Sequence, residues 1–206
     1  MKISDYDFQL SDDLIARYPS EKRDESKLLV VDRKSESFTD AKFKDIINFI
    51  DAGDCLVLND TSVFPARLYG KSSITGRKHE FLLLNYLGNR EWTVLINKSK
   101  KCKIEENFLF DDNLEGKIIK KLLDGVNQVK FNDDLTLHKL ERIAQMALPP
   151  YILKLREYTN NDKNTYQTVY HSSFKQTNEL NEGSIAAPTA GLHFTNFLLE
   201  QLKKKG

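Results

Sequence analysis

A short run near the end of the sequence carries residue types suited to proton transfer beside a bound ligand. Small residues surround Pro188 and Gly191, so the backbone there can approach a ligand closely, and Thr189 adds a hydroxyl group. His193 follows, and its imidazole can exchange a proton near neutral pH. The alternative is a turn whose histidine caps neighbouring carbonyl groups. The run therefore predicts either a proton-transfer site at a close-fitting turn or a purely structural turn.

A second polar cluster, formed by Asn59, Asp60 and Thr61, follows an apolar run, and Arg67 comes a few residues later. Proteins of the α/β class tend to place ligand-binding loops after buried strands. The cluster can hold hydroxyl or amino groups, and the guanidinium of Arg67 can hold a carboxylate or a phosphate. The alternative is an Asx turn followed by a surface arginine. Both interpretations remain open from the sequence.

Two further groups of side chains suit contact with a nucleic acid. Tyr151 and Tyr166 can stack on nucleobases or on a sulfonium group, unless they simply pack at the edge of a core. A lysine-rich loop can contact phosphates, although a solvated surface is the simpler reading for a chain of net charge +1. The loop contains Lys98, Lys100, Lys101 and Lys103.

The elements that must position these residues change in type along the chain. In the first part, residues 28–31 and 55–58 have the pattern of short strands, Thr39 is placed to cap a helix carrying Phe43 and Ile46, and Ser11 is placed to cap an earlier helix. From residue 63 to residue 131, short strand-length runs alternate with turn signals such as Asp124-Gly125. These runs are 63–69, 80–87, 91–96, 108–110, 117–123 and 126–131.

Helical periodicity returns at 136–146 and stops at Pro149 and Pro150. A short helix is expected within 163–170, an irregular segment at 171–187, and a last helix after a capping Thr195. The predicted fold is an α/β domain, made of residues 1–61 and 132–206, with a small antiparallel β-barrel inserted at 62–131.

Composition limits the classes of function. The chain has 206 residues, of which 40% are hydrophobic and 30% charged, as in globular proteins. No apolar stretch approaches the roughly 20 residues of a membrane span, and the N-terminus does not resemble a signal peptide. The two cysteines and four histidines show no spacing typical of metal ligands. We therefore expect a cytoplasmic, monomeric protein with no metal and no membrane contact.

Taken in order, several segments resemble those of the S-adenosylmethionine:tRNA ribosyltransferase-isomerases of queuosine synthesis. They are residues 5–8, 14–19, 59–68, 146–152, 166–170 and 183–194, and the last is the most specific. The resemblance runs along the whole chain, and we call these the signature segments. It implies an α/β domain with an inserted barrel, in agreement with the change of pattern described above.

The resemblance also implies a reaction. Family members transfer the ribosyl part of S-adenosylmethionine to 7-aminomethyl-7-deazaguanine at the wobble position of tRNA, giving epoxyqueuosine, adenine and methionine. S-adenosylmethionine is thus consumed as a substrate, and no cofactor is implied. This chemistry requires a base for the proton beside the sulfonium. By the resemblance, His193 is that base, with Thr189 as its catalytic neighbour.

The remaining roles follow from the same resemblance. Substrate binding falls to Asn59, Asp60, Thr61, Arg67, Tyr151, Tyr166, Pro188, Ala190 and Gly191, and tRNA contact to the four lysines of the basic loop.

The sequence also departs from the family pattern. Ser62 stands where members commonly have a basic residue. Members are also considerably longer, which predicts a C-terminally shortened chain with an incomplete α/β domain. Two hypotheses follow: an active ribosyltransferase-isomerase, or an inactive truncated remnant that at most binds tRNA. A third, an unrelated RNA-binding module, would make the ordered segments a coincidence.

Overall fold

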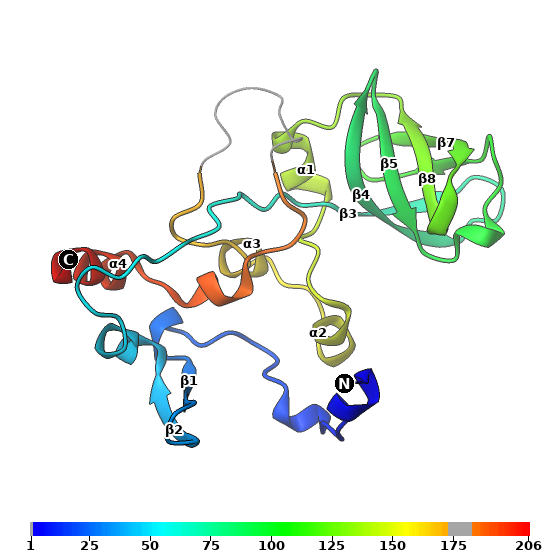
Figure 1. Cartoon of the computed structure of the whole chain (residues 1–206). Helices are drawn as coiled ribbons and strands as arrows, with labels where there is room; N and C mark the ends of the chain where they lie inside the picture. Colours follow the sequence, from blue (N-terminus) through cyan, green and yellow to red (C-terminus); the bar gives the residue numbers. More distant parts are fainter. Residues whose placement is uncertain (1, 173–182) are drawn as a thin grey trace.

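Six antiparallel strands close into a barrel in the computed structural model, which describes residues 2–172 and 183–206 (Figure 1). The strand order is β3-β4-β5-β8-β7-β6, and β3 pairs with β6 to complete the ring. The strands are β3 (Arg67–Ser72), β4 (Lys78–Gly88), β5 (Glu91–Ile96), β6 (Asn107–Leu109), β7 (Glu115–Lys121) and β8 (Val126–Phe131). The predicted antiparallel barrel is confirmed.

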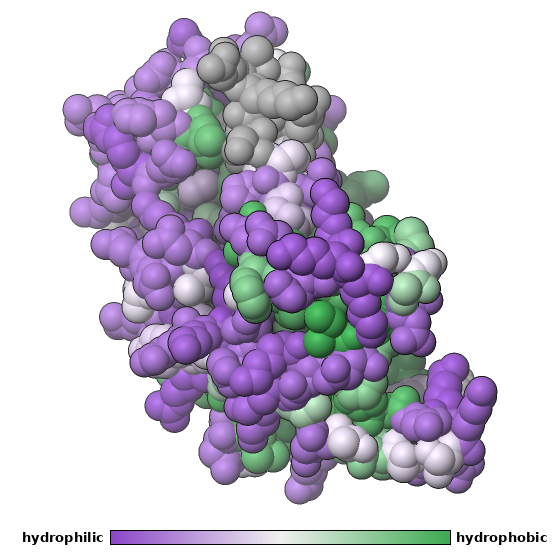
Figure 2. Space-filling view, turned by 90° about the vertical axis from the view of Figure 1, so that its left-hand side faces the viewer, coloured by the Kyte–Doolittle hydropathy of each residue, from purple (hydrophilic) through white to green (hydrophobic). Residues whose placement is uncertain are grey.

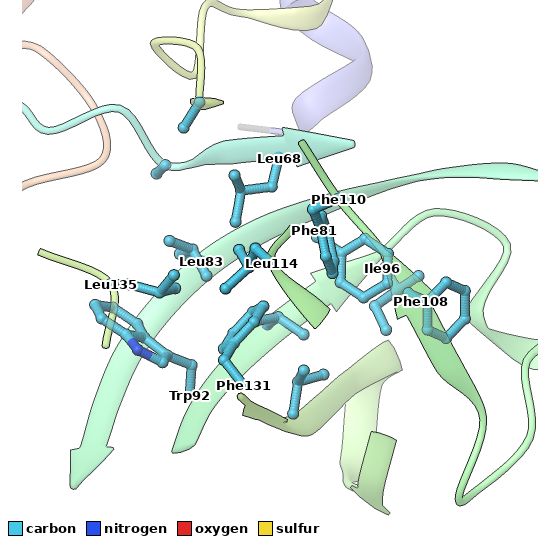
Figure 3. Close-up of a cluster of buried hydrophobic side chains, with 14 of the residues drawn as sticks. Leu68, Phe81, Leu83, Trp92, Ile96, Phe108, Phe110, Leu114, Phe131 and Leu135 are labelled. Carbon is cyan, nitrogen blue, oxygen red and sulfur yellow. The ribbon is translucent and has the colours of Figure 1, made fainter. Parts of the chain in front are cut away.

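The barrel follows from alternation along its strands. In β5, Trp92, Val94 and Ile96 are buried, and the residues between them face outward or are half-buried. Aromatic rings fill the interior, with Phe81 packed edge-on against Phe108 and Phe110 (Figure 3). The turn between β7 and β8 uses positive φ angles of 56° at Asp124 and 79° at Gly125, as the sequence pair predicted.

The part of the chain before the barrel contains a small sheet and short 3₁₀ helices. Strands β1 (Lys27–Asp32) and β2 (Ser37–Lys42) pair antiparallel, and β1 confirms the strand expected at 28–31. The 3₁₀ helices are η1 (Ile3–Tyr6), η2 (Asp12–Leu14), η3 (Arg23–Glu25) and η4 (Phe43–Asn48). The barrel adds η5 (Ser99–Lys101) and η6 (Leu123–Gly125).

Three local predictions for this part are wrong. Thr39 does not cap a helix, because it pairs with Val30 in the β1–β2 sheet and the helical turn starts only at Phe43. Residues 55–58 form no strand; they have no strand partner among the described residues, and Val57 is 86% exposed. The helix expected after Ser11 is only the 3₁₀ turn η2, since the Ser11 hydroxyl bonds the Asp13 carboxylate instead of capping the backbone.

After the barrel the chain is helical. The helices are α1 (Leu137–Ile143), α2 (Pro150–Leu155), α3 (Asp162–Thr165), η8 (Thr189–His193) and α4 (Asn196–Lys205). Thr136 and Thr195 cap α1 and α4 through their side chains, as predicted for Thr195. Helix α1 confirms the helix expected at 136–146 and ends before the two prolines, while Pro150 begins a helix, α2, that was not predicted. The short helix expected within 163–170 is only the single turn α3, which ends at Thr165. Most of the irregular segment expected at 171–187 lies outside the described residues.

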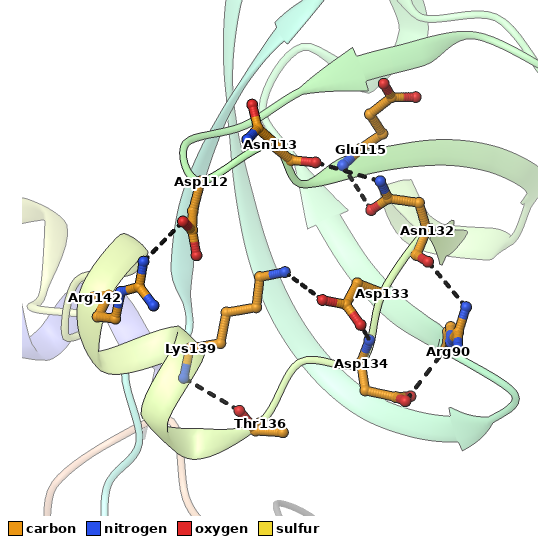
Figure 4. A network of polar contacts seen from close by, with 10 residues as sticks. All are labelled: Arg90, Asp112, Asn113, Glu115, Asn132, Asp133, Asp134, Thr136, Lys139 and Arg142. Carbon is orange, nitrogen blue, oxygen red and sulfur yellow. Dashed lines mark hydrogen bonds and ion pairs between the residues drawn. The ribbon is translucent and has the colours of Figure 1, made fainter.

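Helix α1 is held against the barrel by both core and polar contacts. Leu140 and Ala144 belong to the same buried cluster as the barrel interior. Outside that cluster, Arg142 of α1 pairs with Asp112 at 2.8 Å, and Lys139 pairs with Asp133 at 2.7 Å (Figure 4). The barrel is thereby fixed to the polypeptide that follows it.

The remaining surface exposes several large apolar side chains. Figure 2 views the molecule from the side on which α4 and the β1–β2 sheet lie, and green patches interrupt the hydrophilic surface there. Phe38 of β2 and Phe197 of α4 are both exposed. Among the described residues, no helix is long and apolar enough to cross a membrane.

Candidate functional site

The polar motif that begins at Asn59 runs between two other segments of the chain. On one side, the Asp60 carbonyl accepts a hydrogen bond from the Ser172 backbone amide at 2.8 Å. On the other, Ser184 and Val63 form a parallel bridge, and the Ser184 amide donates to the Ser62 carbonyl at 2.8 Å. The extended geometry thus places a residue of the 183–194 segment beside the 59–68 segment.

Four signature segments share one buried cluster. Val63, Met146, Tyr166 and Ala187 come from four different segments, and all four side chains pack together with Leu192 at the edge. This cluster buries the apolar residues of the segments and leaves their polar neighbours near its margin. The structure therefore brings together pieces that are far apart in the sequence.

Arg23 fastens two signature segments to the N-terminal part of the chain. Its guanidinium donates to the backbone carbonyls of Gln167 at 2.8 Å, Leu192 at 3.0 Å and Asn164 at 2.7 Å. Burial lowers the pKa of Arg23, but the three carbonyls give its charge strong acceptors. The next residue, Asp24, accepts a hydrogen bond from Thr195. This role could not be predicted from the sequence, because an arginine in a polar stretch is ordinarily a surface residue.

Gly191 lies directly against the Tyr170 side chain. A Cβ atom built on Gly191 would stand 2.0 Å from the Tyr170 hydroxyl oxygen and 3.2 Å from a methyl group of Thr168. The Tyr170 ring also packs edge-on against Phe194, and burial raises the pKa of its hydroxyl. The sequence predicted close approach of a ligand to this glycine; in the structure the group that lies against it is a tyrosine of the same chain.

Gly191→Ala is expected to lower the free energy of unfolding by about 1–3 kcal/mol, because the new methyl group must displace the Tyr170 ring. The double variant Gly191→Ala with Tyr170→Phe lacks the overlapping oxygen and should regain part of that loss. Urea unfolding followed by circular dichroism compares the two variants with the unmodified chain. Equal destabilisation of the single and the double variant would show that the hydroxyl is not the obstacle.

His193 ends η8 and is half-buried, with its ring tilted against Phe43 at a centroid distance of 5.2 Å. Within the ranges that the structure describes, no hydrogen bond is made by the His193 imidazole. Thr189 and Ala190 are exposed on the same short helix, and Pro188 precedes it. The catalytic roles of His193 and Thr189 stay predictions.

The other predicted substrate-binding residues divide into two groups. Asn59 forms an Asx turn, with its side-chain oxygen accepting from the Thr61 amide at 3.0 Å, and Asp60 is exposed. Arg67 is only 5% exposed, and its guanidinium bonds Glu80 at 3.1 Å and the Leu148 carbonyl at 3.0 Å. Arg67 thus fastens the barrel to the segment that follows α1, and it is not the surface arginine of the alternative interpretation.

The two tyrosines differ in their surroundings. Tyr166 is buried in the cluster shared by the signature segments, whereas Tyr151 on α2 is 53% exposed. A buried Tyr166 matches the alternative in which the ring packs into a core. Tyr151 alone of the pair presents a ring face that is accessible for stacking.

A cavity of about 550 Å³ opens beside the shared cluster. Its apolar lining comes from Val63, Pro65, Leu137 and Met146, and its polar lining from Ser62, Glu141, Lys163, Asn164, Gln167 and His171. The predicted site residues do not line it. Two of the lining residues come directly after predicted residues: Ser62 follows Thr61, and Gln167 follows Tyr166. Segments that the sequence singled out contribute to the lining, but the lining side chains themselves were not predicted, because a sequence pattern does not specify which side of a loop faces a cavity.

Ser62, noted above as a departure from the expected family pattern, lines this cavity. It is 4% exposed, and its hydroxyl donates to the Ser172 carbonyl at 2.6 Å. The basic loop lies on the barrel, where Lys98, Lys100, Lys101 and Lys103 are all exposed. No group of three or more potential metal ligands occurs in residues 2–172 and 183–206.

The connection between α2 and α3 contains a buried ion pair. Arg156 donates to both carboxylate oxygens of Asp162, at 2.7 and 2.6 Å, and the Thr159 amide and hydroxyl donate to one of them. Burial alone would raise the pKa of Asp162, but the hydrogen bonds from Arg156 and Thr159 lower it overall. The pair fixes the segment that leads into α3 and the cavity.

The structure has an antiparallel barrel inserted between signature segments, and those segments pack around one cluster. This arrangement agrees with the two-domain fold that the sequence resemblance implied. A profile of the queuosine biosynthesis protein family matches residues 3–206, and the chain belongs to that family. It is 44% identical over 208 aligned positions to an S-adenosylmethionine:tRNA ribosyltransferase-isomerase of Acetivibrio thermocellus. That alignment covers 100% of this chain and 58% of the relative, so the chain spans less than two thirds of its length.

A solved structure is also similar in sequence. It is the S-adenosylmethionine tRNA ribosyltransferase of Thermotoga maritima, with 30% identity and a TM-score of 0.35. The match covers 98% of this chain and 54% of that one.

Proposed function

We propose that this chain carries the S-adenosylmethionine-binding and tRNA-binding parts of a ribosyltransferase-isomerase acting in queuosine biosynthesis. The reaction would move the ribosyl moiety of S-adenosylmethionine to 7-aminomethyl-7-deazaguanine at the tRNA wobble position. Epoxyqueuosine, adenine and methionine would be the products. S-adenosylmethionine is then a consumed substrate, and the partners are this nucleoside and its tRNA.

One observation carries the proposal: four signature segments, distant in sequence, pack into one cluster beside a cavity of about 550 Å³. A cavity of this size suits a small organic substrate. The name of the relative that is 44% identical supports the reaction class.

The proposed chemistry assigns roles to this chain's own residues. His193, whose imidazole has no hydrogen-bond partner among the described residues, takes the proton beside the sulfonium, and Thr189 lies four residues earlier on the same short helix. The backbone from Pro188 to Gly191 and the polar Asn59, Asp60 and Thr61 position the substrate. Arg67, Tyr151 and Tyr166 complete the proposed substrate-binding site.

Release of adenine tests the function directly. The 206-residue chain is incubated with S-adenosylmethionine and a tRNA bearing 7-aminomethyl-7-deazaguanine, and adenine is quantified by chromatography. Release that requires both substrates supports the proposal. Binding of tRNA without adenine release would favour the alternative, a non-catalytic remnant.

The basic loop is proposed to contact tRNA phosphates. In the part of the chain that the structure describes, its four ammonium groups form no ion pairs, so their positive charge is available to a polyanion. Replacing Lys98, Lys100, Lys101 and Lys103 by Ala should weaken tRNA binding. The slope of log affinity against log salt should also fall by about 0.7–0.9 per lysine that contacts a phosphate.

Filter binding at several salt concentrations measures that slope. The matched control replaces Lys203 and Lys204, which are exposed near the end of α4. A quadruple variant whose salt slope equals that of the unmodified chain would remove the loop from the tRNA-binding surface.

A further inference from the structure

The cavity beside the shared cluster is lined by both apolar and polar residues, and two of the polar side chains have unused hydrogen-bonding atoms among the described residues. Val63 and Met146 are 4% and 3% exposed, and both line the cavity. Gln167 and His171 line it as well, and both are half-buried. Apolar surface together with directed polar groups can hold an organic ligand that carries both kinds of group.

The orientation of Gln167 is set by its neighbour. Its side-chain oxygen accepts a hydrogen bond from the Val63 backbone amide at 3.0 Å, and its backbone carbonyl is held by Arg23. Since the oxygen is occupied, the amide NH₂ group is the free end. Within the described residues this NH₂ group has no partner, so Gln167 presents a hydrogen-bond donor to the cavity.

His171 presents a hydrogen-bond acceptor to the cavity. Its Nδ1 atom lies 2.6 Å from the Thr168 carbonyl oxygen, and a carbonyl can only accept. Nδ1 therefore carries the hydrogen, and Nε2 of the neutral ring is a hydrogen-bond acceptor. No described residue bonds Nε2. The cavity thus combines one fixed donor with one fixed acceptor.

The charged groups at the cavity are balanced. Lys163 supplies one ammonium group, which donates one hydrogen bond to the Glu141 backbone carbonyl. The Glu141 carboxylate supplies one negative charge and has no ion pair among residues that the structure describes. One positive and one negative group suit a zwitterionic ligand better than a polyanion such as tRNA, which would call for several cations.

We propose that this cavity binds the adenine nucleoside part of S-adenosylmethionine, with Gln167 and His171 as the residues that read the base. An adenine edge offers a ring-nitrogen acceptor beside an amino donor, which complements the Gln167 NH₂ group and His171 Nε2. Glu141 then faces the ammonium and sulfonium charges of the ligand, and Lys163 faces its carboxylate. This inference rests on the proposed function for the identity of the substrate.

Two substitutions remove the atoms proposed to bind the adenine base, and each keeps the hydrogen bond that orients the side chain. Gln167→Glu retains an oxygen for the Val63 amide and replaces the donor by a second acceptor. His171→Asn retains a donor for the Thr168 carbonyl and removes Nε2. Each is expected to weaken adenosine and S-adenosylmethionine binding by about tenfold, as for the loss of one hydrogen bond. His138→Asn, at an exposed position on α1, is the matched control.

Calorimetry with adenosine, S-adenosylmethionine and guanosine measures these affinities on the 206-residue chain. Weaker binding by both variants with unchanged binding by the control supports the inference. Binding of S-adenosylmethionine that neither variant changes overturns it and leaves the proposed function standing. Equal affinity for guanosine overturns the choice of adenine. Adenosine binding that depends on both side chains, without any adenine release, supports the site and contradicts the proposed function.

A second measurement needs no substitution in the cavity. The chain has only two methionines, Met1 and Met146, and Met146 lines the cavity. A sample labelled with ¹³C at the methionine methyl groups therefore gives two signals. Adenosine should shift the Met146 signal and leave that of Met1 in place, and an unmoved Met146 signal at saturating adenosine would overturn the inference.

Discussion

His193→Ala is expected to lower the rate of adenine release by about 10²–10⁴-fold, the usual contribution of a positioned acid or base. The imidazole is the only group on η8 that can exchange a proton near neutral pH, and its nitrogens form no hydrogen bonds within the described residues. Initial rates at saturating S-adenosylmethionine and modified tRNA measure the effect. The KM for S-adenosylmethionine should change little, because the proposed role is in the reaction step.

Two further variants distinguish loss of the His193 proton-transfer group from loss of its ring packing. His193→Phe keeps a ring against Phe43, which lies 5.2 Å away between centroids, and should lose as much activity as His193→Ala. His138→Ala, on the exposed face of α1, should retain the full rate. An unchanged rate in His193→Phe would end the assignment of His193, and His171 in the cavity would be the next histidine to test.

The barrel was predictable because its signals are local. Alternation of buried and exposed residues in β5 and β8, and a turn pair at Asp124 and Gly125, depend only on neighbouring residues. The strand expected at 55–58 failed for the opposite reason. A strand needs a partner, and an apolar run does not show whether one is present.

The candidate site also combines features that the sequence predicts with features that depend on distant contacts. Its segments were found from sequence because each keeps its motif, and Gly191 was recognised because a close approach leaves no room for a side chain. The residues that line the cavity were not found. Gln167 and His171 owe their orientation to Val63 and Thr168, through hydrogen bonds whose geometry only the folded chain defines. The division of the chain into domains at residues 61 and 132 stays a prediction.

Arg23 and Arg67 illustrate why arginines are hard to assign from sequence. Arg67 was predicted to bind a ligand or to lie on the surface, and Arg23 was not singled out; both bond backbone carbonyls of other segments. A guanidinium has five donors in a fixed plane, so it can join several carbonyls at once. Such a role leaves no periodic pattern in the sequence.

Asp162→Ala is expected to lower the free energy of unfolding by about 3–5 kcal/mol, because it leaves the Arg156 guanidinium buried without its partner. The two side chains are only 4% and 6% exposed, and Arg156 makes two bonds to the carboxylate. Urea unfolding at pH 7 measures the loss. Glu25→Ala, which removes an exposed ion pair with Lys44, is the control and should unfold as the unmodified chain does.

The same pair predicts how the loss depends on pH. Because the pKa of Asp162 is lower in the folded than in the unfolded chain, its carboxylate stabilises the fold fully above the unfolded pKa of about 3.9. That stabilisation decreases as the pH falls towards the folded pKa. The difference between the unmodified chain and Asp162→Ala should therefore be constant from pH 7 to about pH 5 and shrink below about pH 4. A difference that stays constant below pH 4 would mean that the carboxylate is not the charged partner of Arg156.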